Sequence, residues 1–174
     1  MRKMITVKIN GEERQYPQGA TYEDVANDYQ QEYENLIALA ARDGKIRELF
    51  KKLTRDCEVT FFTLKDDVGN KTYVRSATML FLKAVFDVYG REAAQSCRVE
   101  FAIGNGSYIS PKGKLNATEE NAAKIRNRMR ELVEAKTPFL KRSYSLDNAM
   151  ELFRKEGMKD KEKLFRYRRG SFVN

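Results

Sequence analysis

Residues 1–64 show short runs of alternating hydrophobic and polar positions, separated by turn residues. Residues 5–9 (Ile-Thr-Val-Lys-Ile) alternate with period two, which is typical of a strand with one buried face. Asn10-Gly11 follows at once, and this pair favours a tight hairpin turn because both central residues of such a turn need positive φ. Residues 13–16 are the expected return strand. The pattern therefore predicts a β-hairpin at the start of the chain.

A helix is expected after the hairpin. Thr21 with Asp24 three residues later resembles a capping box, with Asp in the place of the usual Glu or Gln, and predicts a helix over about 22–29. Further strands are expected at the apolar run 36–41, at 46–50 after an Asp43-Gly44 turn, and at 58–64. The segment 1–64 thus predicts a small domain with a hairpin, a helix and further strands.

The remainder of the chain alternates helical and strand patterns. Residues 65–72 carry charged and turn residues, which favour a linker. An apolar helix at 73–88 is expected to end near Gly90, because glycine suits the left-handed residue that closes many helices. The other expected elements are strands at 98–103 and 107–110 around a Gly104-Asn105-Gly106 turn, a helix at 119–135 capped by Thr118, a strand at 139–144, a helix capped by Ser145 that reaches 156 and is ended by Gly157, and a basic strand-like run at 161–169. The order predicts an α+β chain with a second domain at 73–174.

Positive charge is concentrated in the second part. The chain carries a net charge of +8. Residues 1–66 hold 11 Lys or Arg and 12 Asp or Glu, whereas the rest of the chain holds 22 and 13. This asymmetry suggests an anionic partner for the second domain. The alternative is a basic surface that contacts only solvent.

The composition indicates a cytoplasmic protein without a membrane partner. No apolar run approaches the roughly 20 residues that span a bilayer, and the start of the chain lacks the apolar segment of a signal peptide. Cys57 and Cys97 lie in different expected domains and are interpreted as reduced, small hydrophobic residues. The chain has no His, which together with two isolated cysteines argues against a zinc site.

Residues 1–64 resemble a TGS domain, the β-grasp module of threonyl-tRNA synthetases and some regulatory GTPases. The resemblance is carried by residues 5–11, by 19–26 (Gly-Ala-Thr-Tyr-Glu-Asp-Val-Ala) and by 38–44. It implies a ubiquitin-like β-grasp (TGS) fold for this segment. The alternative is another ubiquitin-like β-grasp domain.

Residues 71 to about 170 are similar to the editing domain that follows TGS in threonyl-tRNA synthetase, which implies an α/β sandwich. The matching segments are 75–79 (Arg-Ser-Ala-Thr-Met), 105–110 (Asn-Gly-Ser-Tyr-Ile-Ser), the helix at 118–135 and 145–153. In that family two His residues, four apart, face one pocket. Arg75 and Met79 occupy their positions here, and neither side chain can perform imidazole acid–base chemistry. The resemblance therefore implies a degenerate editing-like domain without hydrolytic activity.

The arrangement also resembles the N-terminal part of bacterial uridine kinase-like nucleoside kinases, in which a P-loop kinase domain follows. Residues 164–174 look like the seam before such a domain, although the chain itself has no Gly-x-x-x-x-Gly-Lys-Ser/Thr loop. The leading hypothesis is a non-catalytic accessory or regulatory region that binds a ligand or the kinase domain, with ATP and magnesium needed only by a kinase domain absent here. The alternative is a tRNA-related, RNA-binding module derived from threonyl-tRNA synthetase. A third possibility is an interaction scaffold without a ligand.

The candidate binding residues fall into three groups. Arg75, Lys83 and Tyr108 could bind an anion in the former editing pocket, although Arg75 could equally lie over the core as a surface residue. Asn105 belongs either to a tight turn or to a nucleotide-contacting loop, and Lys112 and Lys114 belong to a basic loop that could touch phosphate or only solvent. The densest group is Arg166, Tyr167, Arg168 and Arg169, with Lys141 and Arg142 on an expected neighbouring strand.

Basic residues interleaved with an aromatic one suit RNA, because Arg binds phosphate and Tyr stacks on a base. The other interpretation of residues 166–169 is a linker into the kinase domain. No catalytic residue, no metal ligand and no cofactor is expected within the chain. The expected partners are RNA, a nucleotide or the kinase domain.

Overall fold

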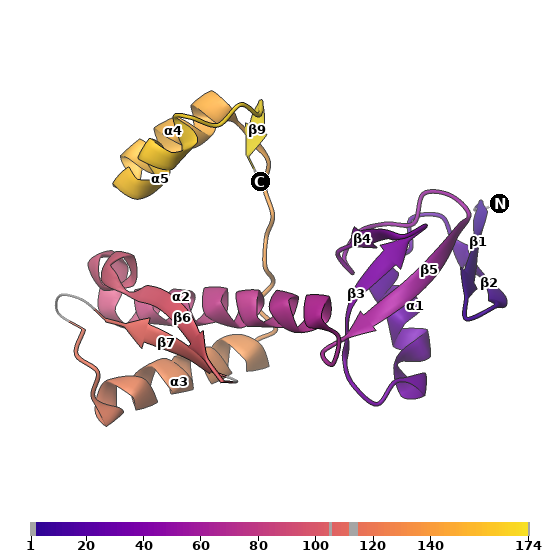
Figure 1. Cartoon of the computed structure of the whole chain (residues 1–174), viewed down its shortest axis with the longest axis horizontal. Helices are drawn as coiled ribbons and strands as arrows, with labels where there is room; N and C mark the ends of the chain where they lie inside the picture. The colour runs from indigo at the N-terminus through magenta and orange to yellow at the C-terminus, as the bar shows by residue number, and fades with distance from the viewer. Residues whose placement is uncertain (1–2, 105, 112–114, 174) are drawn as a thin grey trace. The chain divides into compact units, whose positions relative to one another are not determined.

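The computed structural model describes residues 3–104, 106–111 and 115–173 (Figure 1). The chain divides into two compact units, Met1–Met79 and Leu80–Asn174, with the division inside a long helix. Each unit has a separate hydrophobic core. The chain thus combines a mixed sheet with helices and agrees with the expected α+β class.

The first unit is built on a five-stranded mixed sheet. Its strands are β1 (Met4–Ile9), β2 (Glu12–Pro17), β3 (Ile37–Arg42), β4 (Lys45–Arg47) and β5 (Cys57–Thr63), in the order β2-β1-β5-β3-β4. The pair β1–β5 is parallel and the other pairs are antiparallel. Asn10 and Gly11 have φ of 51° and 88°, which confirms the hairpin turn expected from their residue types. The predicted strand at 46–50 is wrong in its second half, because the backbone beyond β4 bonds to helix α1 instead.

Helix α1 (Tyr22–Tyr29) packs its buried face on this sheet, and a 3₁₀ turn, η1 (Gln30–Glu32), follows it. Both halves of the predicted capping box are present: Asp24 N donates to Thr21 Oγ1 at 3.1 Å, and Thr21 N donates to Asp24 Oδ2 at 2.7 Å. The core between helix and sheet contains Ile5, Val7, Ile9, Tyr22, Val25, Tyr29, Ile37, Val59 and Phe61. The helix boundaries agree with those predicted from the sequence.

Helix α2 (Asp67–Ser96) begins directly after β5 and takes in most of the residues expected to form a linker. Asp66 accepts hydrogen bonds from Thr63 N (2.7 Å) and Thr63 Oγ1 (2.9 Å), so the chain turns into the helix without an extended connection. Gly90, with φ 83°, interrupts the helix, which confirms the break expected there. The assignment of the two domains at 1–64 and 73–174 stays a prediction.

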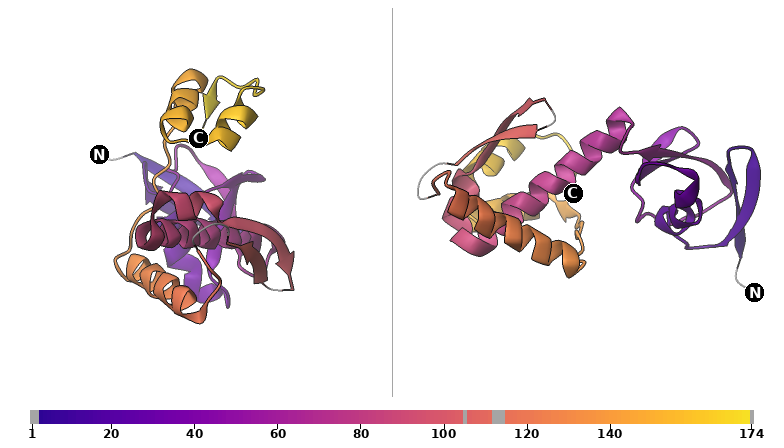
Figure 2. Two further views of the ribbon diagram at one scale, coloured as in Figure 1. Left: turned by 90° about the vertical axis from the view of Figure 1, so that its left-hand side faces the viewer. Right: turned by 90° about the horizontal axis from the view of Figure 1, so that it is seen from below.

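The second unit continues with a hairpin and a helix (Figure 2). Strands β6 (Arg98–Ile103) and β7 (Gly106–Ser110) pair antiparallel, and α3 (Glu119–Glu134) is capped by Thr118, whose Oγ1 accepts from Asn121 N at 3.2 Å. Its core joins α2, α3 and the segments beside them through Ala84, Val85, Ala93, Cys97, Leu115, Ile125 and Leu132. The expected hairpin and the expected Thr118 cap are both confirmed.

The C-terminal segment 144–173 contains β8 (Tyr144–Ser145), α4 (Leu146–Lys155), α5 (Lys159–Phe165) and β9 (Phe172–Val173). Gly157, with φ 67°, ends α4 as expected. Two predicted strands are wrong. Of the strand predicted at 139–144, residues 139–143 are not a strand, and only Tyr144 is paired, where β8 meets β9. Residues 159–165 are a helix, since Phe165 packs on Phe153 at 5.1 Å between ring centroids and Glu162 pairs with Arg154 at 3.2 Å.

Among the described residues, no helix is long and apolar enough to cross a membrane.

Candidate functional site

An exposed aromatic pair lies on the β6–β7 hairpin. Phe101 and Tyr108 are cross-strand neighbours, and their rings stack at 5.2 Å with an interplanar angle of 21°. The two side chains are 59% and 49% exposed, so the stacked rings face solvent instead of the core. A flat, rigid and exposed pair of rings is a surface on which a base can stack. Tyr108 was among the residues expected to bind a ligand. Phe101 was missed because its position opposite Tyr108 depends on the pairing register of β6 and β7, which the sequence alone does not give.

The basic segment Arg166–Tyr167–Arg168–Arg169 forms a bend between α5 and β9. Arg166 N donates to Glu162 O at 3.2 Å, and Arg168 N donates to Phe165 O at 3.1 Å, so the backbone of the segment is held by the end of α5. The Arg168 guanidinium lies over the Phe165 ring at 5.2 Å. All four side chains are exposed, and Tyr167 is 79% exposed.

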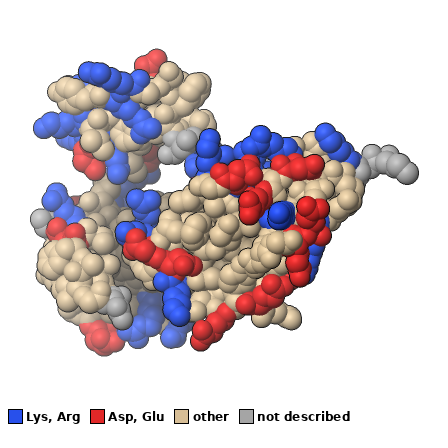
Figure 3. Space-filling view, turned by 45° about the vertical axis from the view of Figure 1, so that its right-hand side comes forward, with Lys and Arg blue, Asp and Glu red and all other residues tan. Residues whose placement is uncertain are grey.

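In Figure 3, Lys and Arg are more prominent than Asp and Glu on the visible face of the C-terminal part of the chain, where α4 and α5 lie. The residue types predicted for RNA binding are therefore at the surface, on a bend and not on a strand. Lys141 and Arg142 are also exposed, but the strand that was expected to carry them beside this segment is not formed.

The two residues that the resemblance matches to the editing-site His pair lie on α2. Arg75 and Met79 are exposed, and no hydrogen bond or ion pair of the Arg75 side chain is found in the described part of the chain. Arg75 belongs to the first unit, while Lys83 and Tyr108 belong to the second. Their grouping in one anion-binding pocket stays a prediction.

Lys83 is engaged in packing α2 on α3. Its ammonium pairs with Asp87, whose other carboxylate oxygen accepts from Arg128 Nε at 2.9 Å. Hydrogen bonds from Lys83 and Arg128 hold the pKa of Asp87 below its ordinary value. A ligand that takes Lys83 would have to compete with this ion pair. The other predicted site residues, Asn105, Lys112 and Lys114, lie outside the described residues.

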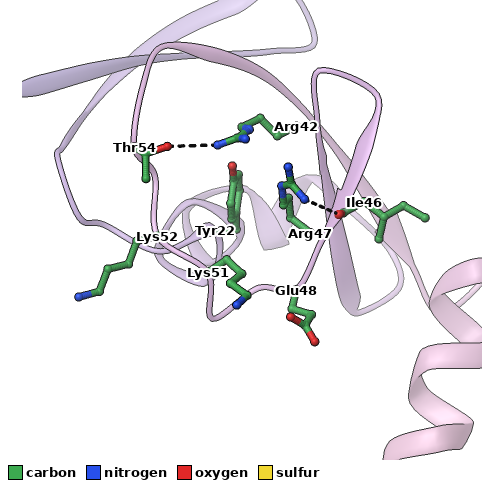
Figure 4. A pocket seen from close by; sticks show the side chains of 8 residues that line it. All are labelled: Tyr22, Arg42, Ile46, Arg47, Glu48, Lys51, Lys52 and Thr54. Atoms are coloured by element: carbon green, nitrogen blue, oxygen red, sulfur yellow. Dashed lines mark hydrogen bonds between the residues drawn. The ribbon is translucent and has the colours of Figure 1, made fainter. Parts of the chain in front are cut away.

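A basic cavity in the first unit was not foreseen from the sequence. It has a volume of about 430 Å³ and lies where α1, β4 and the loop before β5 meet (Figure 4). Its polar lining includes Tyr22, Arg42, Arg47, Lys51, Lys52 and Thr54. The signal that could have found it is the charge density of residues 42–55, which hold six Lys or Arg and two Asp or Glu inside a domain of nearly balanced charge.

Comparison with known proteins bears on which function these surfaces serve. No family model matches the chain. The chain is similar to threonine–tRNA ligases. It is 28% identical to the ligase of Thermotoga neapolitana over 99% of its own length, 28% identical to that of Thermotoga maritima over 98%, and 27% identical to that of Maricaulis maris over 94%. The chain spans only about a quarter of the length of these relatives, between 25% and 28%.

The similarity covers both units and supports a threonyl-tRNA synthetase-like chain. It favours the alternative hypothesis, a module derived from a tRNA synthetase, over the leading one, since the relatives named here are ligases and not nucleoside kinases. Neither a kinase connection nor a TGS assignment gains support from these relatives.

Proposed function

We propose that this chain is a non-catalytic, RNA-binding module derived from a threonyl-tRNA synthetase, with tRNA or a related structured RNA as its partner. The observation that carries the proposal is the similarity to threonine–tRNA ligases over 94% to 99% of the chain. The similarity is not confined to one motif, so a common origin explains it better than convergence on a local structure.

The finer fold assignment is part of this proposal. The first unit is a β-grasp, TGS-like domain. Its strand order β2-β1-β5-β3-β4, its parallel central pair and the helix packed on one face support this assignment. The second unit is a degenerate editing-like domain, in which the order of the long helix, the hairpin and the capped helix α3 follows the order of the matching segments.

The absence of His from the sequence supports a non-catalytic role. Hydrolysis of an aminoacyl ester at neutral pH needs a group that accepts and returns a proton, most often an imidazole. Arg75 stays protonated and Met79 has no proton to transfer. Binding can persist after this chemistry is lost, because phosphate contacts need only positive charge and hydrogen-bond donors.

Two exposed surfaces of the second unit suit RNA. The basic segment 166–169 supplies three guanidinium groups for phosphates and Tyr167 for stacking. The Phe101–Tyr108 pair supplies a second stacking surface. RNA is recognised chiefly by such contacts with the backbone and with unstacked bases.

The test is binding of the whole chain to tRNA as a function of salt concentration. Counterion release predicts a log–log slope of roughly −0.7 to −0.9 for each phosphate neutralised. Replacing Arg166, Arg168 and Arg169 together by Ala should weaken binding and make the slope shallower by about 2 to 3, because each Arg accounts for up to one phosphate contact.

The matched control removes the same number of exposed charges elsewhere, by replacing Lys71, Lys124 and Arg126. Each of these cations already pairs with a carboxylate, Asp67, Glu120 or Glu119. The control should change affinity and slope much less. Equal losses in both variants would mean that only net charge matters, and salt-independent binding of the parent chain would reject the RNA proposal.

A further inference from the structure

The cavity at Tyr22 contains a buried hydroxyl for which no acceptor is found among the described residues. Tyr22 is 1% exposed, and no hydrogen bond to its Oη is found within the described residues. A buried hydroxyl left unpaired costs about 1 to 3 kcal/mol, so such a group in a folded protein needs an explanation. Burial raises the pKa of Tyr22 and outweighs the opposing effects of Arg42, whose guanidinium lies close enough to direct an N–H at the hydroxyl oxygen. The hydroxyl therefore stays protonated at neutral pH and keeps its own proton to donate.

The same cavity gathers positive charge. Arg42 and Arg47 come from β3 and β4, and Lys51 and Lys52 from the loop that follows. In the view of Figure 4, the Tyr22 hydroxyl points toward the Arg42 guanidinium, and the Arg47 guanidinium is drawn to its right. Two guanidinium groups and a hydroxyl donor lining one cavity suit a ligand that supplies acceptor oxygens.

These cations are weakly engaged by the protein itself. Arg42 Nη1 donates to Thr54 Oγ1 at 3.2 Å, and Arg47 Nη1 makes a long contact of 3.5 Å with the carbonyl of Ile46. Among the described residues, the ion pairs found at Asp43 and Glu12 involve Arg55 and Arg14 and not the four cations of the cavity. Glu48 also lines the cavity, and its carboxylate points away from Tyr22 in Figure 4.

The cavity wall is held in place by backbone hydrogen bonds. Tyr22 N donates to Lys51 O at 3.0 Å, and Glu23 N donates to Leu49 O at 2.8 Å. Leu53 exchanges backbone hydrogen bonds with Ala20 and Gly19, at 2.7 Å and 3.3 Å. The loop that carries Lys51 and Lys52 is thus fixed to the start of α1. These bonds also occupy the first helix amides, so a ligand would be bound by side chains and not by the helix terminus.

We propose that this cavity is a binding site for a phosphate group. A phosphate offers several acceptor oxygens and a charge of about −1.5 to −2 as a monoester at neutral pH. It can accept from the Tyr22 hydroxyl and pair with Arg42 and Arg47 together, which Arg geometry favours. The phosphate can belong to a free nucleotide or to an RNA end, since both present the same group.

The hydroxyl is tested by titrating inorganic phosphate into ¹⁵N-labelled protein while backbone amide shifts are followed. Saturable shifts at residues 21–22, 42–47 and 51–54 are expected. Tyr22→Phe removes only the hydroxyl, and should weaken phosphate binding by about tenfold, the loss of one hydrogen bond to a charged group. It should leave the thermal stability of the ligand-free protein unchanged or slightly higher, because no protein partner is lost.

Tyr29→Phe is the matched control. Tyr29 has a second buried hydroxyl without a hydrogen-bond partner in the described part of the chain, but it does not line the cavity. This variant should bind phosphate as the parent does. Equal phosphate affinity of the Tyr22→Phe variant and the parent would overturn the role of the hydroxyl, and absence of saturable shifts in the parent would overturn the site.

The charge is tested with a second pair of variants on β4. Arg47→Gln should lower phosphate affinity by about tenfold or more, because it removes a charge-assisted hydrogen bond. Lys45→Gln removes an exposed cation of the same strand that does not line the cavity and should have little effect. Equal losses of phosphate affinity in the two variants would show that affinity depends only on net charge. That result would contradict a specific binding site at the cavity.

The source of the phosphate is separated by competition. Adenosine monophosphate and a short RNA, with and without a 5′-phosphate, are added to phosphate-saturated protein. Displacement by the nucleotide at lower concentration than by the RNA assigns a free nucleotide, and preference for the 5′-phosphorylated RNA assigns an RNA end. Failure of tRNA binding in the earlier experiment leaves the phosphate titration untouched, so the two proposals fail separately.

Discussion

Gly69 shows how one residue allows α2 to start directly against the sheet. A Cβ built at this position would lie 2.0 Å from the carbonyl oxygen of Thr63 and 2.8 Å from its carbonyl carbon. Both atoms belong to the backbone at the end of β5 and cannot move aside as a flexible side chain could. Gly69 is buried against this backbone. A glycine is therefore needed here because it has no side chain, and not because of its conformational freedom.

Gly69→Ala is therefore expected to destabilise the first unit by about 1 to 3 kcal/mol, the range of overpacked sites. Chemical denaturation followed by circular dichroism measures the change. Gly106→Ala is the control, since a Cβ there would meet only the Ile103 carbonyl oxygen at 3.6 Å, an ordinary contact. A Gly69→Ala variant as stable as the control would show that the start of α2 can shift away from β5.

The capping box at Thr21 gives a pH dependence whose sign can be stated. Asp24 accepts from the Thr21 backbone and hydroxyl at 2.7 and 2.8 Å, and these hydrogen bonds lower its pKa. A carboxyl group whose pKa is lowered by folding stabilises the folded state at pH values above the pKa of the same group in the unfolded chain. This stability is lost as the pH falls through the folded-state pKa. Thr21→Ala should cost about 1 kcal/mol at neutral pH.

Asp24→Asn should remove the part of the acid destabilisation that Asp24 contributes, measured as the slope of unfolding free energy against pH. Asp67→Asn serves as the comparison, because Asp67 is an exposed carboxylate in the first turn of α2 that pairs with the exposed Lys71. The same slope in the Asp24→Asn variant as in the parent would contradict a role for the box.

At the scale of elements, one carboxylate ties α2 to α3. Asp87 lies on α2 with its side chain only 15% exposed, and it holds both Lys83 of its own helix and Arg128 of α3. Glu131 also binds Arg128, at 2.8 Å, but from the same helix and with 62% of its side chain exposed. The first pair joins two elements, whereas the second adds a surface ion pair of small value.

Asp87→Ala should destabilise the second unit by about 1 to 2 kcal/mol, because Arg128 loses a charge-assisted partner between helices. Glu131→Ala, which removes the other partner of the same Arg, should change stability by less than about 0.5 kcal/mol. Equal effects would show that the α2–α3 ion pair does not contribute to packing. Urea denaturation of the two variants side by side makes the comparison.

Elements with strong local signals could be predicted from the sequence, and those that depend on distant partners could not. The Asn10-Gly11 turn, the Thr21 box and the Gly157 helix end each follow from residues within a few positions. The strand expected at 139–144 is formed only at Tyr144, because a strand needs a partner and β9 reaches no further. The helix at 159–165 was missed because its packing on α4 cannot be recognised in a basic sequence.

The candidate sites follow the same division. The exposed basic segment 166–169 was found because its residues are adjacent in the chain. The Tyr22 cavity was missed because its lining comes from α1, from β3–β4 and from the loop at 51–54, which only the folded sheet brings together. The net charge of the first domain gave no sign of the cavity, because acidic residues elsewhere in the domain balance the basic residues that line it.

At the scale of the whole molecule, the two hydrophobic cores share no residue. The core of the first unit ends with Phe61, and that of the second begins with Ala84. The division falls inside helix α2, between Met79 and Leu80. Each core should therefore set the stability of its own unit.

The expected result is two unfolding transitions that single substitutions move one at a time. Gly69→Ala should lower the hydrogen-exchange protection of β1, β3 and β5 and leave α3 unchanged, while Asp87→Ala should do the reverse. In the double variant the two losses should add within about 0.5 kcal/mol, as they do for sites without shared partners. A single cooperative transition, shifted equally by both substitutions, would mean that α2 couples the cores into one folding unit. If the cores are coupled in this way, phosphate binding at the Tyr22 cavity would also raise the hydrogen-exchange protection of the second unit. If the two units unfold independently, added phosphate should raise the exchange protection of the first unit alone.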